Sequence, residues 1–263
     1  MNDIKHSKGN FMTPQVPDLD PLSEKRQRVF VILAAVFIGS MTLLNVVGIT
    51  RFIQLGPLSL AVGVLPYPLT FLCTDLISEL YGKKKASLVV WIGFVINLFM
   101  ILVVFLGYKI PSVPTEVQPP WQTLFLAKPV PLANGEVVTG SIDVFHIIYA
   151  CTVGSVFASM MAYLAAQFCD VQLFHFWKEL TKGKHLWLRN NFSTIVSQLV
   201  DSFMVIAITF GAVWWRGDMG IKEILILMGS NYLFKVVAAL LDTFPFYLGV
   251  KKLTKYLELD KVR

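Results

Sequence analysis

The sequence has few charged residues for its size. Of its 263 residues, 15% are Asp, Glu, Lys or Arg, and 55% are apolar. Soluble domains usually carry about a quarter charged residues. A water-soluble fold of this length has too little interior for 20 Phe, nine Met and six Trp. Long runs almost free of charge therefore predict an all-α polytopic membrane protein.

Motifs for catalysis, nucleotides and metals are also lacking. The four histidines share no ligand spacing, and we interpret the three cysteines (Cys73, Cys151 and Cys169) as reduced apolar side chains. There is no Walker loop, dinucleotide fingerprint or nucleophile elbow. We therefore expect no catalytic residue, cofactor or metal, and no ATP-driven pump formed by this chain alone. The net charge of +6 resides in short segments between apolar runs, so we expect no nucleic-acid partner.

Six apolar stretches are each close to the ~20 residues that a helix needs to cross a bilayer. They cover 29–50, 58–80, 87–108, 144–168, 191–214 and 222–249. We divide the chain into a cytosolic tail (1–27), a transmembrane domain (28–250) and a second cytosolic tail (251–263). The first tail lacks the apolar core of a signal peptide. The outer loop, 109–142, holds six of the 13 prolines and the turn signal Asn134-Gly135, and it forms either a plain loop or a short hairpin.

Basic residues indicate how the chain is oriented. If the N-terminus is cytosolic, 17 of the 23 lysines and arginines lie in inner segments and five in outer loops, with Lys235 inside a span. Positive residues resist translocation, so we predict that both termini are cytosolic. Asp75 and Asp201 lie in the second span of each half, and these two spans run in opposite directions. That is the layout of an inverted 3+3 repeat.

Polar residues interrupt the second span. Pro66 and Pro68 remove two backbone donors and predict a kinked or broken helix, which is tolerated at membrane depth only within protein or beside a wet cavity. Asp75 and Glu79 follow at i, i+4 spacing and face the same way. A carboxylate near the bilayer centre costs ~3 kcal/mol, so we expect Asp75 to face a site. Glu79 either faces it too or lies at the cytosolic interface beside 83–85.

Polar side chains also recur at helical spacing in the last two spans. They are Thr194, Gln198 and Asp201 in the fifth span, and Asn231, Lys235 and Asp242 in the sixth, where Pro245 predicts a kink. Lys235 lies too deep to reach the headgroups, so we expect it to pair with Asp201 or Asp75, either in a site or as a purely structural ion pair. Asn45 and Asn97 either join the same cavity or bridge helices.

Three blocks of this sequence resemble one known family. They are Pro66-Tyr67-Pro68-Leu69-Thr70-Phe71-Leu72-Cys73-Thr74-Asp75-Leu76-Ile77-Ser78-Glu79-Leu80-Tyr81-Gly82, the stretch from Gln167 through Asp170, Lys178 and Arg189-Asn190-Asn191 to Asp201, and Lys235 with Leu241-Asp242-Thr243. The resemblance is to the stand-alone queuosine precursor transporters, formerly called vitamin uptake transporters, and covers about 30–250. It implies a six-helix transporter of the bacterial inner membrane that imports 7-cyano- and 7-aminomethyl-7-deazaguanine for queuosine salvage in tRNA.

The polar residues suit such a substrate. A deazaguanine presents N1–H and a 2-amino group side by side, which a carboxylate accepts, while its O6 needs a donor and its ring stacks on aromatic side chains. We therefore expect the substrate-binding residues to be Asn45, Tyr67, Phe71, Asp75, Glu79, Arg189, Thr194, Gln198, Asp201, Asn231, Lys235 and Asp242. Proton symport and passive entry followed by trapping in tRNA both remain open.

Two other functions fit a small helical membrane protein. One is the substrate-binding subunit of a multi-component vitamin importer, although the first span lacks the Ala-x-x-x-Ala pattern typical of those subunits. The other is an intramembrane enzyme. A homodimer is compatible with Gly39 and Gly48 in the first span, but these glycines equally suit packing within one bundle.

Overall fold

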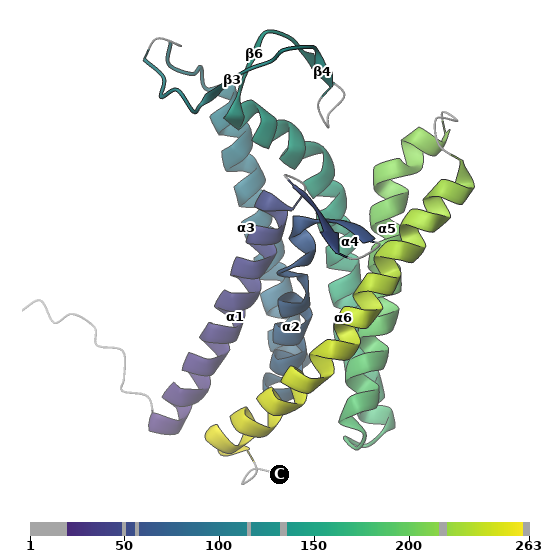
Figure 1. Cartoon of the computed structure of the whole chain (residues 1–263). Helices are drawn as coiled ribbons and strands as arrows, with labels where there is room; N and C mark the ends of the chain where they lie inside the picture. Colours follow the sequence, from purple (N-terminus) through teal and green to yellow (C-terminus); the bar gives the residue numbers. More distant parts are fainter. Residues whose placement is uncertain are drawn as a thin grey trace, which may run out of the picture.

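The computed structural model describes residues 20–48, 51–55, 58–114, 117–131, 136–215 and 220–259. Six α-helices dominate this part of the chain (Figure 1). They are α1 (Pro21–Val47), α2 (Tyr67–Tyr81), α3 (Lys83–Lys109), α4 (Val144–Leu180), α5 (Leu186–Trp215) and α6 (Ile221–Tyr256). Four stretches of the described residues are long and apolar enough to cross a membrane: α1, α3, Leu186–Ile208 of α5, and α6. The mainly helical membrane class is thus confirmed, whereas six crossings and the inverted repeat stay predictions.

The helices form two groups of three that meet at α2. Helix α1 packs on α2 and α3, and α5 packs on α4 and α6. Contacts of α2 with α4 and α6, and of α3 with α4, join the groups. Nine of the 15 residues of α2 are buried, among them Asp75, so this carboxylate does not face lipid. An aromatic core joins α2 to α1 and α4. In it, Phe71 of α2 packs together with Phe37 of α1 and Tyr163 of α4.

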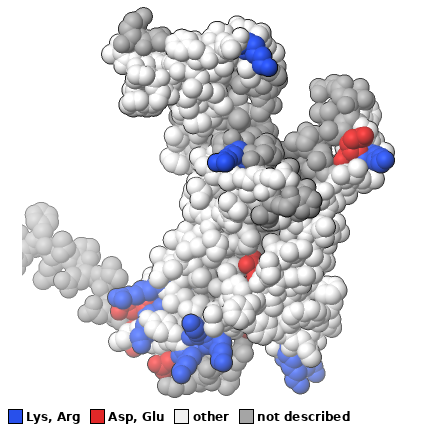
Figure 2. Space-filling view, in the orientation of Figure 1, with Lys and Arg blue, Asp and Glu red and all other residues white. Residues whose placement is uncertain are grey.

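The outer surface of the helix bundle is apolar, as expected for a surface that faces lipid. Large apolar side chains are exposed along the outside of the bundle, for example Ile32 on α1, Phe99 on α3 and Leu241 on α6. Such surface is stable against hydrocarbon but not against water. Lysines and arginines gather where α1 begins and α6 ends, and the middle of the visible face is nearly free of charge (Figure 2). The start of α1 and the end of α6 both lie at this basic end of the bundle (Figure 1). That this end faces the cytosol stays a prediction.

The second predicted span, 58–80, is not one helix. Strands β1 (Phe52–Leu55) and β2 (Leu58–Ala61) form an antiparallel hairpin, and a 3-10 turn, η1 (Val62–Val64), leads to α2. Pro66 and Pro68 lie at the start of α2, where backbone N–H groups have no partner within the helix in any case. The prolines therefore begin the helix, and the break that they predict lies before it. With 15 residues, α2 is only about 22 Å long.

Two glycines allow the turn η1 to approach the C-terminal end of α1. The Gly63 N–H donates to the Gly48 carbonyl at 3.2 Å, and a Cβ on Gly63 would lie 2.8 Å from the Gly48 Cα. Gly48 thus serves packing within the chain. At Gly39 a Cβ would meet no described atom within 4 Å, so this face of α1 stays open to a neighbouring helix, and the homodimer stays a prediction.

The other spans differ from the prediction mainly in length. Helix α4 runs 12 residues beyond the predicted end at 168, and α6 continues through Pro245 to Tyr256. In the outer loop, β3 (Thr123–Phe125) pairs with β6 (Ser141–Asp143), and β4 (Val130–Pro131) pairs with β5 (Val137–Val138), both antiparallel. The short-hairpin alternative for this loop is confirmed, while Asn134-Gly135 lies outside the described residues.

Candidate functional site

One face of α2 carries four candidate residues in a line. Tyr67, Phe71, Asp75 and Glu79 follow one another every four residues, so they lie one above the other along the helix. Helix α5 supplies the partners in the reverse order, because its residue nearest the α2 N-terminus is Asp201 and its residue nearest Glu79 is Arg189. This antiparallel arrangement gives three levels of polar contacts between the two halves of the molecule.

The first level joins three helices at one carboxylate. The Tyr67 hydroxyl lies 2.9 Å from Asp201 Oδ2 and 3.0 Å from Gln198 Oε1. The Lys235 ammonium pairs with the same Asp201 oxygen and lies 4.8 Å from the centre of the Tyr67 ring. Lys235 is 7% exposed and Asp201 2%. Of the two partners expected for Lys235, the structure therefore selects Asp201.

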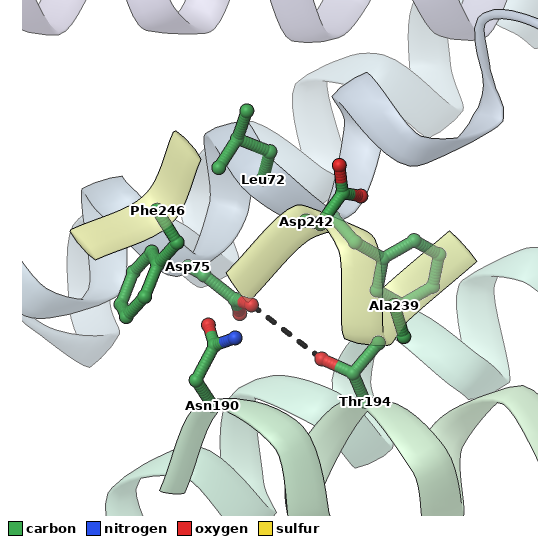
Figure 3. A pocket seen from close by; sticks show the side chains of 8 residues that line it. Leu72, Asp75, Asn190, Thr194, Ala239, Asp242 and Phe246 are labelled. Atoms are coloured by element: carbon green, nitrogen blue, oxygen red, sulfur yellow. Dashed lines mark hydrogen bonds between the residues drawn. The ribbon is translucent and has the colours of Figure 1, made fainter. Parts of the chain in front are cut away.

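The second level is a pocket between α2, α5 and α6. It is lined by Phe71, Leu72, Asp75, Asn190, Thr194, Ala239, Asp242 and Phe246. Thr194 donates to Asp75 Oδ2 at 3.5 Å, and the Asn190 amide is directed toward the Asp75 carboxylate (Figure 3). Asp75 Oδ1 and Asn190 Oδ1 are buried and accept no hydrogen bond from the described residues. The pocket thus presents acceptors that lack donors.

The pocket is narrow in this conformation. It holds about 210 Å³ of empty space including its open mouth, and its interior accommodates roughly one water molecule. This pocket therefore has no room for a purine in this conformation. Helix α6 closes one side of it with Ala239, Asp242 and Phe246, opposite α2 and α5.

Helix α4 places a second carboxyl group against the same face of α5. Ser197, three residues after Thr194, donates to Asp170 Oδ1 at 3.1 Å, and Asp170 Oδ2 is buried and accepts no hydrogen bond from the described residues. Asp170 is fully buried. Sequence reasoning did not include Asp170 among the site residues because it follows the predicted end of the fourth span at 168. Its signal in the sequence is its place in the second block of family resemblance, three residues after Gln167, which puts the two polar side chains on one helical face.

The third level is an ion-pair network at the basic end of the bundle. Arg189 Nη2 lies 2.6 Å from Glu79 Oε1, and Lys178 Nζ lies 2.9 Å from Glu79 Oε2. Arg189 also donates to the Gly183 carbonyl at 2.8 Å, which fixes the turn between α4 and α5. Neither Glu79 nor Arg189 lines the pocket. Of the two alternatives for Glu79, this geometry favours the interface position, with Lys178 and Arg189 as its partners.

Comparison with known proteins matches this architecture to a family. The family described as "Putative vitamin uptake transporter" matches residues 61–249. The chain belongs to this family. A "Probable queuosine precursor transporter" of Bacillus subtilis (strain 168) is 26% identical over 220 residues, which cover 83% of each chain. No solved structure matches. The family and this relative are named as transporters, so this protein is a transporter and not an enzyme.

The matched segment contains all three levels of polar contacts, from Tyr67 to Asp242, and begins after the end of α1. In α1, Asn45 donates to Asn97 Oδ1 of α3 at 2.7 Å and does not reach the pocket, so it bridges two helices. Asn231 is half-buried one turn before Lys235 and lies outside the pocket lining. Among the described residues, the candidate site therefore comprises the polar contacts along α2, α5 and α6.

Proposed function

We propose that this transporter imports 7-deazaguanine precursors of queuosine across the bacterial inner membrane for tRNA modification. The observation that carries the proposal is the chemical character of the pocket. Its polar lining consists of the carboxylates of Asp75 and Asp242, the unpartnered carbonyl oxygen of Asn190 and the Thr194 hydroxyl. A ligand with adjacent hydrogen-bond donors satisfies these acceptors, and buried acceptors without donors are costly.

A guanine-type edge supplies such donors. Its N1–H and 2-amino group lie side by side and donate to one carboxylate, and a 7-aminomethyl ammonium adds a third donor for a second carboxylate. Adenine carries an acceptor where guanine carries N1–H, so adenine would leave Asp75 or Asn190 without a donor. Sites built to hydrogen-bond a substrate reject analogues that lack the matching groups.

Aromatic side chains flank the polar part of the pocket. Phe71 of α2 and Phe246 of α6 both line it and are almost fully buried. A flat bicyclic ring is stabilised by stacking on or between such side chains. The Lys235 ammonium and the Gln198 amide, one level further along α5 and α6, are the candidate donors for the substrate O6.

Transport by alternating access requires the pocket to open, and α6 is suited to this motion. Pro245 has no N–H, so the backbone bond to the Leu241 carbonyl is missing one turn from Asp242. The helix is therefore easier to bend beside the residues that close the pocket. At the first level, the Lys235–Asp201 pair holds α6 against α5, so it must lengthen or break as the pocket opens toward that side.

Uptake into a strain that cannot make the precursor tests the proposal. We expect expression of this chain to restore queuosine in tRNA at nanomolar external 7-cyano- or 7-aminomethyl-7-deazaguanine, measured by mass spectrometry. The purified chain alone in liposomes should accumulate the intact compound. Asp75→Asn should abolish uptake, whereas Asp143→Asn, at the remote start of α4, should not.

Three outcomes would contradict the proposal. Uptake of biotin or other vitamins in place of deazaguanines would assign another substrate class. A requirement for a second membrane protein and an ATPase would identify a subunit of a multi-component importer. Conversion of the compound inside liposomes would identify an enzyme.

A further inference from the structure

We propose that Asp242 makes this transporter select the cationic 7-aminomethyl precursor over the neutral 7-cyano precursor. The inference rests on the proposed function and names the preferred substrate of the same pocket. Its basis is the distribution of charge around the pocket, to which α6 contributes a second carboxylate and in which none of the lining residues is basic. Asp242 thus acts by direct contact with the substituent that distinguishes the two compounds.

The pocket lining carries two acidic side chains and no basic one. Asp75 of α2 is 3% exposed, and Asp242 of α6 is half-buried. The other lining residues carry no charge: Phe71, Leu72, Asn190, Thr194, Ala239 and Phe246. Two like charges that are enclosed without a counter-charge are unfavourable in a medium of low dielectric. A guest with a positive charge reduces this cost when the pocket closes around it.

Basic side chains close to this level of the bundle have other partners. Lys235 pairs with Asp201, and Arg189 lies 2.6 Å from Glu79. None of these four residues lines the pocket. Among the described residues, neither of the two lining carboxylates forms an ion pair. Both carboxylates are therefore left for the guest.

Three helices present the polar groups of the pocket. The Asp75 carboxylate of α2 lies between Asn190 of α5 and Asp242 of α6 (Figure 3). Asn190 is 3% exposed, and its Oδ1, like Asp75 Oδ1, is buried and accepts no hydrogen bond from the described residues. The N1–H and 2-amino groups of a deazaguanine suit these two acceptors. Its C7 substituent leaves the opposite end of the bicyclic ring and is then directed toward α6, which carries Asp242.

The two precursors differ at this end of the molecule. An aminomethyl group is protonated at neutral pH, as lysine is, and donates charge-assisted hydrogen bonds to a carboxylate. A nitrile is neutral and only accepts hydrogen bonds, so beside Asp242 it places one acceptor against another. When closure expels water, Asp242 is paired in the first case and left without a donor in the second.

The same contact favours closure of the pocket. A substrate that binds α2 and α5 through its guanine edge and α6 through its ammonium bridges the three helices that enclose it. The neutral compound lacks the contact with α6. Discrimination therefore arises from a group of the pocket that the wrong substrate leaves unpaired, which is the stronger way to reject an analogue.

Uptake into proteoliposomes that contain only this chain tests the inference. KM and maximal rate are measured for 7-aminomethyl-, 7-cyano- and 7-hydroxymethyl-7-deazaguanine. The hydroxymethyl compound matches the aminomethyl compound in size but carries no charge. The variants are Asp242→Asn, which removes the charge and keeps the shape, and Asp242→Glu, which keeps the charge. Glu179→Gln is the control, because it removes a negative charge at an exposed position of α4.

For the wild-type chain and Glu179→Gln, we expect a KM for the aminomethyl compound that is about tenfold or more below that for either neutral compound. Asp242→Asn should raise it until the three KM values agree within about twofold. Asp242→Glu should retain the preference of the wild type. Uptake of the neutral compounds by Asp242→Asn shows that this variant folds. If it does not fold, the wild type decides: equal KM values for the aminomethyl and hydroxymethyl compounds overturn the inference.

Other results overturn the inference in distinguishable ways. Wild-type uptake of all three compounds with equal KM leaves the proposed function intact and removes selection by charge. An Asp242→Asn variant that keeps the preference assigns selection to another group. An equal loss of all three compounds in this variant gives Asp242 a role in the transport cycle and none in selection. Failure of the wild-type chain to transport any deazaguanine removes the proposed function and the inference together.

Discussion

Tyr67 and Asp201 lie 134 positions apart in the sequence, and the hydroxyl of the first lies 2.9 Å from the carboxylate of the second. The Lys235 ammonium contacts the same carboxylate oxygen. One buried oxygen atom therefore joins α2 of the first half to α5 and α6 of the second half. Such a shared acceptor couples the three helices, because moving any one of them weakens the bonds of the others.

Lys235→Met should destabilise the protein strongly. Removing one partner leaves the Asp201 charge buried without its ammonium, and breaking a buried ion pair in this way costs about 3–5 kcal/mol of unfolding free energy. The double variant Lys235→Met/Asp201→Asn should lose clearly less, because neither charge remains. Denaturant unfolding in detergent measures both. Equal losses in the single and double variants would show that the pair contributes through packing alone.

Asp242→Asn should weaken substrate binding. Asp242 lines the pocket and is half-buried. A hydrogen bond to a charged group contributes about 1.5–3 kcal/mol, so we expect the apparent KM for 7-aminomethyl-7-deazaguanine to rise by about tenfold or more. Initial uptake rates in liposomes give KM and maximal rate separately. A KM equal to that of the remote variant Asp143→Asn would exclude Asp242 from the binding site.

Glu79→Gln should affect stability and not affinity. The variant weakens the contacts of Glu79 with Lys178 and Arg189, of which Arg189 is 3% exposed. We expect a loss of about 3 kcal/mol in unfolding free energy, as for other broken buried pairs, and a substrate Kd within about twofold of wild type.

The matched control for that variant is Glu24→Gln. Glu24 pairs with Arg28 on the exposed surface of α1, and surface pairs contribute at most about 1 kcal/mol. If Glu79→Gln raised Kd tenfold and left stability unchanged, Glu79 would belong to the substrate site after all.

His175 should make stability depend on pH. It lies beyond the predicted fourth span, and burial together with the positive charges of Lys178 and Lys83 lowers its pKa below the ordinary 6.5. The unfolded chain therefore takes up the proton first as the pH falls. The contribution of neutral His175 to the free energy of unfolding is fully present above pH 6.5. This contribution is lost as the pH falls from there toward the lower pKa of the folded state.

A comparison of unfolding at pH 7 and pH 5 checks this expectation. His175→Gln should show a smaller loss between the two pH values than the wild-type chain. His185→Gln, a change at an exposed histidine in the turn after α4, should resemble wild type. If all three chains lost the same stability, other groups would control the pH dependence.

The sequence predicts the helices and several of their polar contacts well. Apolar runs locate all six helices because lipid-facing and buried positions are both apolar. The spacing of Thr194, Gln198 and Asp201 correctly predicts a polar stripe, since residues at i, i+4 and i+7 share one helical face. The depth of Lys235 predicts that it needs an anionic partner, and the structure supplies Asp201.

Other features depend on contacts that one sequence does not reveal. Strand β2 falls within the predicted second apolar span because Leu58–Ala61 contains one polar residue, Ser59, and the sequence does not reveal its pairing with β1. Asp170 lies past the apolar run of α4, and its burial depends on α2 and α5 packing over it. Glu79 has the same spacing from Asp75 whether its partner is a substrate or Arg189, so periodicity alone does not distinguish the two.

The extra length of α4 has a practical consequence for imaging. Its 12 residues beyond position 168 add about 18 Å of helix, and α5 packs antiparallel beside it. The exposed turn 182–185 between the two helices lies at the end of this longer α4 in a 29.5 kDa protein. An antibody fragment raised against this turn would provide the particle mass and the asymmetric landmark that electron microscopy needs for alignment. Its epitope would lie apart from the pocket between α2, α5 and α6, so open and closed carriers could be imaged with the same fragment.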